Sequence, residues 1–313
     1  MRKSSLCIAC LSVVSLALVV HAQNRKAAKR AKLPTFQANQ TSRFFFDDVL
    51  AQLQGERPAS PNASVATVET PGAPDAATVG ESYAWSKIIS PSTVEDEVKK
   101  LKNAINTSIT TPTEFAGKGY KEIRRDFSIL AMVFAIINEY DADVRWKKDA
   151  AAARDIFART AANAKAGGNI NVYKESKRRN DELTDLMGGS SLGNQPEEQA
   201  NNWEQIADRN PLMQRLVTGA EENLSKWTSN EDEFSNNIEE VLHEAEIVAA
   251  IGEVLIREGM EDGDDEEYAA FAKLMETSAL DIVAAVKLND ADQARKANGE
   301  IAKACSNCHD NYR

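Results

Sequence analysis

The sequence ends with Cys305-Ser-Asn-Cys308-His309-Asp-Asn-Tyr312-Arg313, and this stretch decides how the rest of the chain is interpreted. The pattern C-x-x-C-H is the attachment signature of a c-type haem. The two cysteines lie about one helical turn apart on one face, which suits thioether bonds to the two vinyl groups of the porphyrin. His309 follows them, where a neutral imidazole can ligate the iron. The stretch therefore predicts one covalently bound haem c.

Two other kinds of site use paired cysteines. A zinc site needs a fourth ligand and usually a second cysteine pair. Outside residues 1–22 the sequence has no other cysteine, and its only other histidine is His243. A thioredoxin-like motif begins the helix of a βαβ unit rather than ending a helical chain. Both interpretations are weaker than haem attachment.

Residues 1–22 have the parts of a secretory signal peptide. Arg2 and Lys3 begin it, an apolar run from Leu6 to Val20 follows, and Val20-His-Ala22 resembles a cleavage site. The apolar run is shorter than the about 20 residues that a membrane span needs. We expect a bacterial protein that is exported, for example to the periplasm, with no membrane span in its mature form. Export agrees with the attachment of c-type haem outside the cytoplasm.

The net charge indicates whether nucleic acid or protein is the more suitable binding partner. The chain carries 37 Lys and Arg against 48 Asp and Glu, a net charge of −11. Cleavage after residue 22 removes Arg2 and Lys3 and no acidic residue, which leaves −13. An acidic surface disfavours nucleic acid as a partner. It favours solubility and permits a basic redox partner protein. Because Cys7 and Cys10 lie in the signal peptide, no disulfide is expected in the mature chain.

Residues 23–80 are predicted to be a disordered, flexible tail. It begins with a basic cluster, and residues 57–80 contain four prolines among Ala, Ser, Thr and Gly, as linkers do. Residues 44–53 form a short amphipathic segment within it. This segment either caps the chain's own helices or docks on a partner.

From residue 81 onward the apolar residues recur at three- and four-residue spacing, which predicts an all-α fold. Four amphipathic helices fall in residues 81–191 and four in residues 201–313, with a polar link at 192–200. Short turns between such helices are typical of up-down four-helix bundles. We therefore predict two tandem up-down four-helix bundles. A capping box, Ser92-Thr-Val-Glu95, marks the expected start of the first helix.

The two halves align as a tandem repeat when the chain is shifted by 118 residues. Trp85-Ser-Lys-Ile88 then falls on Trp203-Glu-Gln-Ile206. The same shift places Met187, Ser190 and Ser191 where the haem motif stands. The first half is therefore predicted to be a bundle without haem. The alternative is a pair of unrelated helical bundles.

A C-x-x-C-H motif on the final helix, followed at once by Asp-Asn-Tyr-Arg, resembles the cytochrome c′ family. The usual small cytochromes c carry this motif near their start. The likeness is specific over residues 305–313 and architectural over 201–304, whereas the tandem arrangement and the long tail depart from it. Family members are typically single bundles that pair into dimers. The resemblance therefore implies a cytochrome c′-like second half, with the haem-free half in place of a second subunit.

The resemblance also implies roles for the terminal residues. Cys305 and Cys308 would hold the haem, and His309 would be the axial ligand of the iron. Arg313, four residues past the histidine, would lie beside the proximal face of the haem and tune the iron. The alternative for Arg313 is a cation favoured by the helix dipole at a C-terminus.

The sixth iron position decides the function. Family members with an apolar residue over the iron bind nitric oxide or carbon monoxide, whereas low-spin relatives use a methionine near the start of the first helix. Met213 stands at that place in this chain, although methionine at helical spacing also packs in cores. Leu212, Leu216 and Val217 would otherwise wall the distal pocket. His243 falls off the apolar stripe and is a weaker candidate for a second ligand.

Three functions stay open. The first is an exported monohaem electron carrier, and the second is a five-coordinate haem protein that binds nitric oxide or carbon monoxide. The third is a partner-binding scaffold with an auxiliary haem, in which residues 44–53 and the first bundle carry the function. We expect no enzymatic activity, because the sequence has no nucleophile–base constellation and no glycine-rich phosphate loop.

Overall fold

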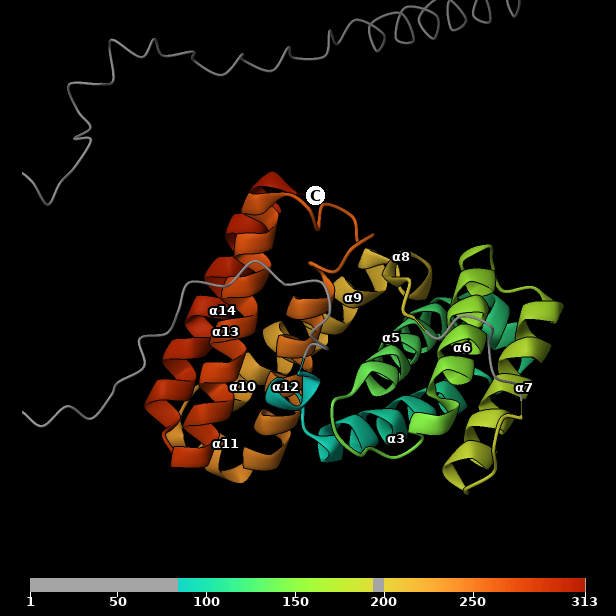
Figure 1. Cartoon of the computed structure of the whole chain (residues 1–313), viewed down its shortest axis with the longest axis horizontal. Coiled ribbons are helices and arrows are strands. Elements are labelled where there is room, and N and C mark those ends of the chain that lie inside the picture. Colours follow the sequence, from blue (N-terminus) through green and yellow to red (C-terminus); the bar gives the residue numbers. More distant parts are fainter. Residues whose placement is uncertain (1–83, 194–199, 313) are drawn as a thin grey trace, which may run out of the picture. The chain divides into compact units, whose positions relative to one another are not determined.

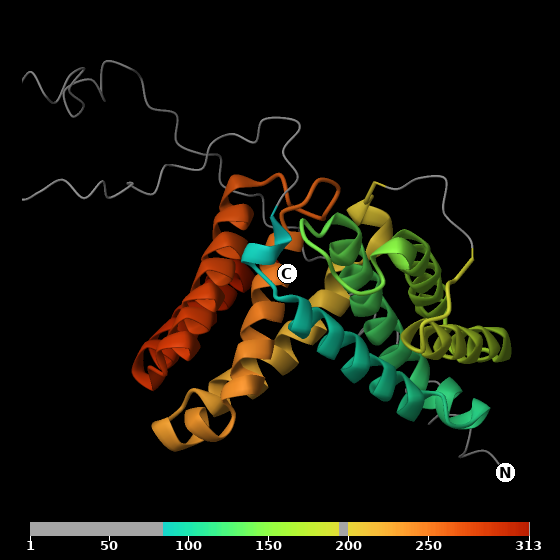
Figure 2. The same cartoon turned by 60° about the horizontal axis from the view of Figure 1, so that its bottom comes forward.

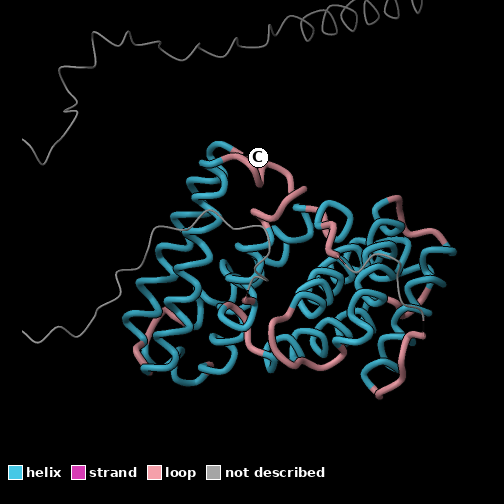
Figure 3. Tube along the Cα trace, in the orientation of Figure 1, coloured by secondary structure: helices cyan, strands magenta, loops and turns pink. Residues whose placement is uncertain are grey.

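The computed structural model describes residues 84–193 and 200–312, which belong to one compact unit. Within these ranges the regular elements are helices and there is no strand (Figure 3). The predicted all-α class is therefore confirmed. None of the described helices is long and apolar enough to cross a membrane. The signal peptide, the tail with residues 44–53 and most of the polar link lie outside the described residues.

The first half contains four main helices (Figure 1). They are α3 (Pro91–Ser108), α5 (Tyr120–Glu139), α6 (Ala150–Lys165) and α7 (Ile170–Met187). The short elements are η2 (Trp85–Lys87), α4 (Pro112–Glu114), the π-helical η3 (Phe115–Gly119) and η4 (Lys147–Asp149). α5 is the central helix of this half, because it is buried from Asp126 to Ile137 and packs against both α3 and α6.

The predicted start of the first helix is wrong by two residues. The N-cap of α3 is Ser90, whose Oγ accepts a hydrogen bond from the backbone N of Thr93 at 3.3 Å. Pro91 takes the first helical position, where its fixed φ suits the helix and its missing N–H leaves no unpaired donor. The capping box at Ser92 therefore does not form.

The second half is also helical. It contains α8 (Trp203–Ile206), α9 (Arg209–Leu216), the π-helical η5 (Val217–Leu224), α10 (Ser225–Trp227), α11 (Glu231–Asn236), α12 (Ile238–Val254), α13 (Glu266–Leu288) and α14 (Ala291–Asn311). α9, η5 and α10 run on as one continuous helical segment, and α13 packs closely against both α12 and α14. The first residues of α3 and α9 are 118 residues apart, and so are the first residues of α5 and α12. This spacing is consistent with the tandem repeat. The boundary between two bundle domains stays a prediction.

The two halves meet through α3 and α5 of the first and α9 and α12 of the second (Figures 1 and 2). A buried charge cluster lies in this interface. The Nε and Nη2 atoms of Arg215 donate to the two carboxylate oxygens of Glu97 at 2.9 and 3.2 Å. Its Nη1 donates to Glu244 at 2.6 Å, and His243 Nε2 lies 2.8 Å from Glu97 Oε2. His243 therefore belongs to the interface between the halves.

The cluster fixes the ionisation of Glu97. Burial by itself raises the pKa of this carboxyl group, but the charge of Arg215 and hydrogen bonds from His243 and Arg215 outweigh burial. The pKa of Glu97 is therefore held far below its ordinary value, and the side chain is a carboxylate at neutral pH.

Replacing Glu97 by Gln should destabilise the protein in a pH-dependent way. Breaking a buried ion pair leaves an uncompensated charge, so we expect a loss of about 3 kcal/mol in the free energy of unfolding at pH 7. A depressed pKa in the folded state stabilises the protein above the pKa of the unfolded state, about 4.3, and this stabilisation is lost as the pH falls below it. The difference between wild type and Glu97→Gln should therefore shrink from pH 7 to pH 3 in denaturant titrations.

The matched control is Asp96→Asn on the same helix. Asp96 pairs with Lys99 at 2.8 Å, and both side chains are about half exposed. Such a surface pair contributes about 0–1 kcal/mol. A difference between wild type and Glu97→Gln that stayed constant from pH 7 to pH 3 would contradict our account of the cluster.

Candidate haem site

α14 carries all three residues of the haem motif. The helix begins after its N-cap Asp290, whose side chain accepts a hydrogen bond from the backbone N of Gln293 at 2.9 Å. Its apolar side faces α13, with Ile301 and Ala304 buried. Cys305, Cys308 and His309 follow in its last turns and are partly buried.

An apolar pocket of about 30 Å³ joins the motif to α9 and α13. It is lined by Met213, Leu216, Leu255, Tyr268, Phe271, Ala272, Met275, Ala304, Cys305, Cys308 and His309. The structure thus brings Met213 and Leu216 to the motif from a helix almost one hundred residues earlier in the chain. The two other expected wall residues lie elsewhere: Leu212 is fully buried away from the pocket, and the side chain of Val217 is 41% exposed.

A second cavity, of about 350 Å³, lies between η5 and α14. Cys305 and His309 line it as well, together with Ala220 and Glu221 of η5. The motif therefore stands between two cavities along the seam of the α9–η5 segment and α14. A π-helix such as η5 is rare in proteins and is frequently found at functional sites.

These residues fit a haem. Two thiols and an imidazole project from one helix, and the facing wall is almost entirely apolar, as the faces of a porphyrin require.

Burial controls the ionisation of the two thiols. It raises the pKa of Cys305 to about 11, and the negative charges of Glu221 and of Cys308 add to the effect. Burial also raises the pKa of Cys308, opposed by the charge of Arg209 and reinforced by Asp262. Both cysteines are therefore protonated thiols at neutral pH in the haem-free chain.

Side chains that sequence analysis left without a role fasten the helix ends around the motif. Tyr312 Oη donates to Asp265 Oδ1 at 2.7 Å, and the rings of Tyr312 and Tyr268 meet edge to face at 5.3 Å. On α9, Arg209 pairs with Asp262 at 2.6 Å, and its guanidinium lies 5.7 Å from the ring centre of Tyr268. From the sequence alone, only the closeness of Tyr312 to the motif could have pointed to one of these residues. The others are near the motif only in the folded structure. Arg313 lies outside the described residues.

The first half has different chemistry at the corresponding place. Arg145 Nη2 donates to the backbone O of Met187 at 2.6 Å, and its Nη1 lies 3.6 Å from Glu95 Oε2. Arg145 thereby bridges α3 and the end of α7. Its guanidinium also lies 4.7 Å from the ring centre of Trp146.

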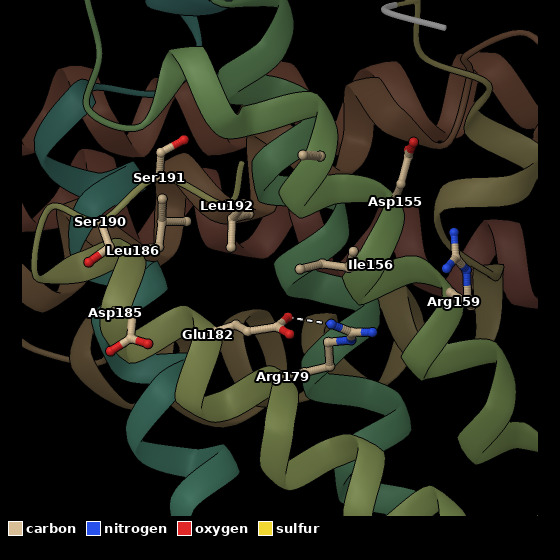
Figure 4. Close-up of a pocket in the computed structure, with 11 residues that line it drawn as sticks. Asp155, Ile156, Arg159, Arg179, Glu182, Asp185, Leu186, Ser190, Ser191 and Leu192 are labelled. Atoms are coloured by element: carbon tan, nitrogen blue, oxygen red, sulfur yellow. Dashed lines mark hydrogen bonds and ion pairs between the residues drawn. The ribbon is translucent and has the colours of Figure 1, made fainter. Parts of the chain in front are cut away.

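A pocket of about 380 Å³ opens between α6 and α7 (Figure 4). Its wall combines apolar side chains with charged ones, among them Arg159, Asp185 and the ion pair of Arg179 with Glu182. It contains no cysteine or histidine. Among the described residues, no group of three His, Cys, Asp or Glu side chains is placed to hold a metal ion.

Comparison with known families supports the haem interpretation of the second half. Residues 263–313 match the model of the family described as Cytochrome C'. The matched stretch runs from the turn before α13 through α14 and contains the whole motif, so the match implies a haem cofactor. The resemblance to cytochrome c′ is confirmed for these residues. The comparisons with curated proteins and with solved structures found no match to the chain.

The raised pKa of Cys305 can be measured in haem-free protein produced without export. Because the thiolate is the nucleophile, a pKa of about 11 slows alkylation by iodoacetamide at pH 8. We expect Cys305 in a Cys308→Ser variant to react more slowly than Cys308 in a Cys305→Ser variant, because Cys305 is the more deeply buried thiol and its pKa is raised to about 11. Its rate should rise steadily up to about pH 11.

Unfolding in urea provides the control, since it exposes both thiols and should make the two rates equal. Equal alkylation rates in the folded protein at pH 8 would contradict the burial of Cys305.

Proposed function

We propose that this chain is an exported monohaem c-type cytochrome that transfers electrons. The observation that carries the proposal is that Met213 and the C-x-x-C-H motif line one apolar pocket from facing helices. The match of residues 263–313 to the cytochrome c′ family supports the haem part of the proposal.

Each side chain has one task in this proposal. Cys305 and Cys308 would hold the haem through thioether bonds, and His309 would ligate the iron. Met213 would supply a thioether sulfur as a second ligand, and methionine ligation raises the reduction potential. Haem contributes reversible one-electron chemistry when it is bound. Apolar residues such as Phe271 and Met275 limit the access of water, which also tunes the potential.

The proposal includes one haem per chain and no catalytic activity. Arg145 bridges α3 and α7 where the first half would otherwise need a haem slot. If His309 and Met213 both held the iron, it would keep no open position for a substrate. The net charge of −13 after cleavage suits a basic redox partner protein.

The alternative function is binding of nitric oxide or carbon monoxide at a five-coordinate iron. Leu216 favours it, because this buried side chain lines the same pocket one helical turn after Met213 and could cover the distal face instead.

A scaffold role would be carried by the first half together with residues 44–53. Comparing partner capture with and without residues 23–80 would test it.

Replacing Met213 by Leu should separate electron transfer from gas binding. Leu keeps the volume but removes the sulfur ligand, so we expect the visible spectrum of the oxidised protein to change from low-spin to high-spin. The reduced variant should then bind carbon monoxide, whereas the wild type should not.

Met275→Leu is the matched control, because Met275 lines the same pocket from α13 and has no ligand role in our proposal. Its spectrum should stay low-spin. An unchanged low-spin spectrum in Met213→Leu would exclude Met213 as the ligand. A high-spin wild type that binds carbon monoxide would favour the gas-binding function.

Export can be checked by intact mass. Protein purified from the periplasm should have the mass of residues 23–313 plus one haem, because the signal peptide ends at Ala22. A mature protein that retained residues 1–22, or carried no haem, would contradict the proposal.

A further inference from the structure

Two buried contacts join residues that are 118 residues, or one repeat, apart in the sequence. The ring centres of Trp85 and Trp203 lie 6.2 Å apart, and Arg215 bonds to Glu97 with a separation of 118 residues. The same number separates the starts of α3 and α9 and those of α5 and α12. Equivalent residues of the two halves therefore touch each other.

A residue meets its own equivalent only near a two-fold axis, where the contacts are also reciprocal. The helix contacts show this reciprocity, since α5 packs on α9 and α3 packs on α12. The N-caps behave alike: Ser90 donates to Glu246 of α12 at 2.8 Å, and Asp208 accepts from Arg124 of α5 at 2.8 Å. The two halves are therefore related by a pseudo-two-fold axis that passes close to the tryptophan pair and the ion pair.

The charges on the two sides of this axis differ. Glu97 in the haem-free half corresponds to Arg215 in the haem half. A second pair of equivalent residues shows the same difference in charge. Glu139 of the first half corresponds to Arg257 of the second half, and both contact Trp85. Trp85 Nε1 donates to Glu139 at 3.1 Å, and the guanidinium of Arg257 lies 4.9 Å from a ring centre of Trp85.

The two halves also differ in the space that is available next to the Arg215–Glu97 ion pair. A Cβ atom on Gly219 would lie 2.8 Å from the carboxylate of Glu244 and 2.9 Å from Nη1 of Arg215, so glycine makes room for this pair. The corresponding residue of the first half, Leu101, is a buried apolar side chain. Glycine at position 219 therefore leaves the space that Arg215 and Glu244 occupy.

We propose that these acid–arginine differences make the haem-free half the built-in partner of the haem half, so that this face binds the other half of the same chain and not a second copy. Two haem halves paired about such an axis would bury Arg215 against Arg215, and two haem-free halves would bury Glu97 against Glu97. Like charges brought together in a buried interface exclude the wrong partner. The proposal does not depend on which side chain ligates the iron.

A charge-exchange cycle in the full-length holoprotein tests the pairing. All variants carry Glu244→Gln, so that position 215 can hold either charge without a third carboxylate. The cycle compares this background with Glu97→Arg, with Arg215→Glu, and with both substitutions together. We expect each single exchange to lower the thermal midpoint and the double exchange to recover more than half of the larger loss.

Sedimentation of the wild type gives the second readout, and a monomer is expected over the whole accessible concentration range. The proposal would be overturned if the decreases in thermal midpoint caused by the two single exchanges added up in the double variant. It would also be overturned if the wild type formed a dimer that Arg215→Glu dissociates. If a reversed charge prevents folding, the same cycle with Glu97→Gln and Arg215→Gln replaces it. A double loss smaller than the sum of the single losses then supports the pairing, and additive losses overturn it.

Arg124→Ala is the control for a contact across the halves that lies away from the axis. The Arg124–Asp208 pair joins the halves at 2.8 Å, but both side chains are partly exposed. Its loss should change the thermal midpoint little and leave the oligomeric state unchanged.

Discussion

The buried bond between Arg215 and Glu97 fixes α9 between the two halves, and the arrangement of the haem motif depends on that position. Arg215 points toward the first half, whereas Met213 and Leu216, on the same helix, line the pocket of the motif. α9 thus belongs to the interface on one side and to the candidate haem site on the other. Whatever moves α9 relative to the first half also moves this wall of the pocket, which gives the first half a structural part in the candidate site.

Burying this much charge is possible only because the cluster is paired internally. Glu97 accepts two hydrogen bonds from Arg215 and one contact from His243, and Arg215 also reaches Glu244. An isolated charge at this depth would be costly, whereas a fully bonded group keeps its ionised form. The arrangement contributes less to stability than an apolar interface could. In our proposal the cluster provides specificity, because near the axis of two identical halves each residue would meet its own copy, and an acid and an arginine could not face each other at equivalent positions.

The two helical halves carry different chemistry. In the second half, α14 ends with two thiols and an imidazole against an apolar wall. In the first half, Arg145 ties α3 to the end of α7, and the pocket between α6 and α7 is lined by guanidinium and carboxylate groups as well as apolar side chains. Helix packing tolerates such exchange because the core positions stay apolar in both halves.

Local periodicity determined much of this protein from sequence alone. It predicted the all-α class and the helical position of the C-x-x-C-H motif, because these depend on spacing within one helix. Met213 was singled out by the resemblance to cytochrome c′ and not by periodicity. The 118-residue shift was also visible in the sequence. Only the tertiary structure decided that Glu97 meets Arg215, that His243 bonds to Glu97 and that Tyr312 reaches Asp265. Helical spacing tells which face of a helix is buried, but the partner of that face depends on how distant segments dock, and docking is set by the shape and charge of both surfaces together.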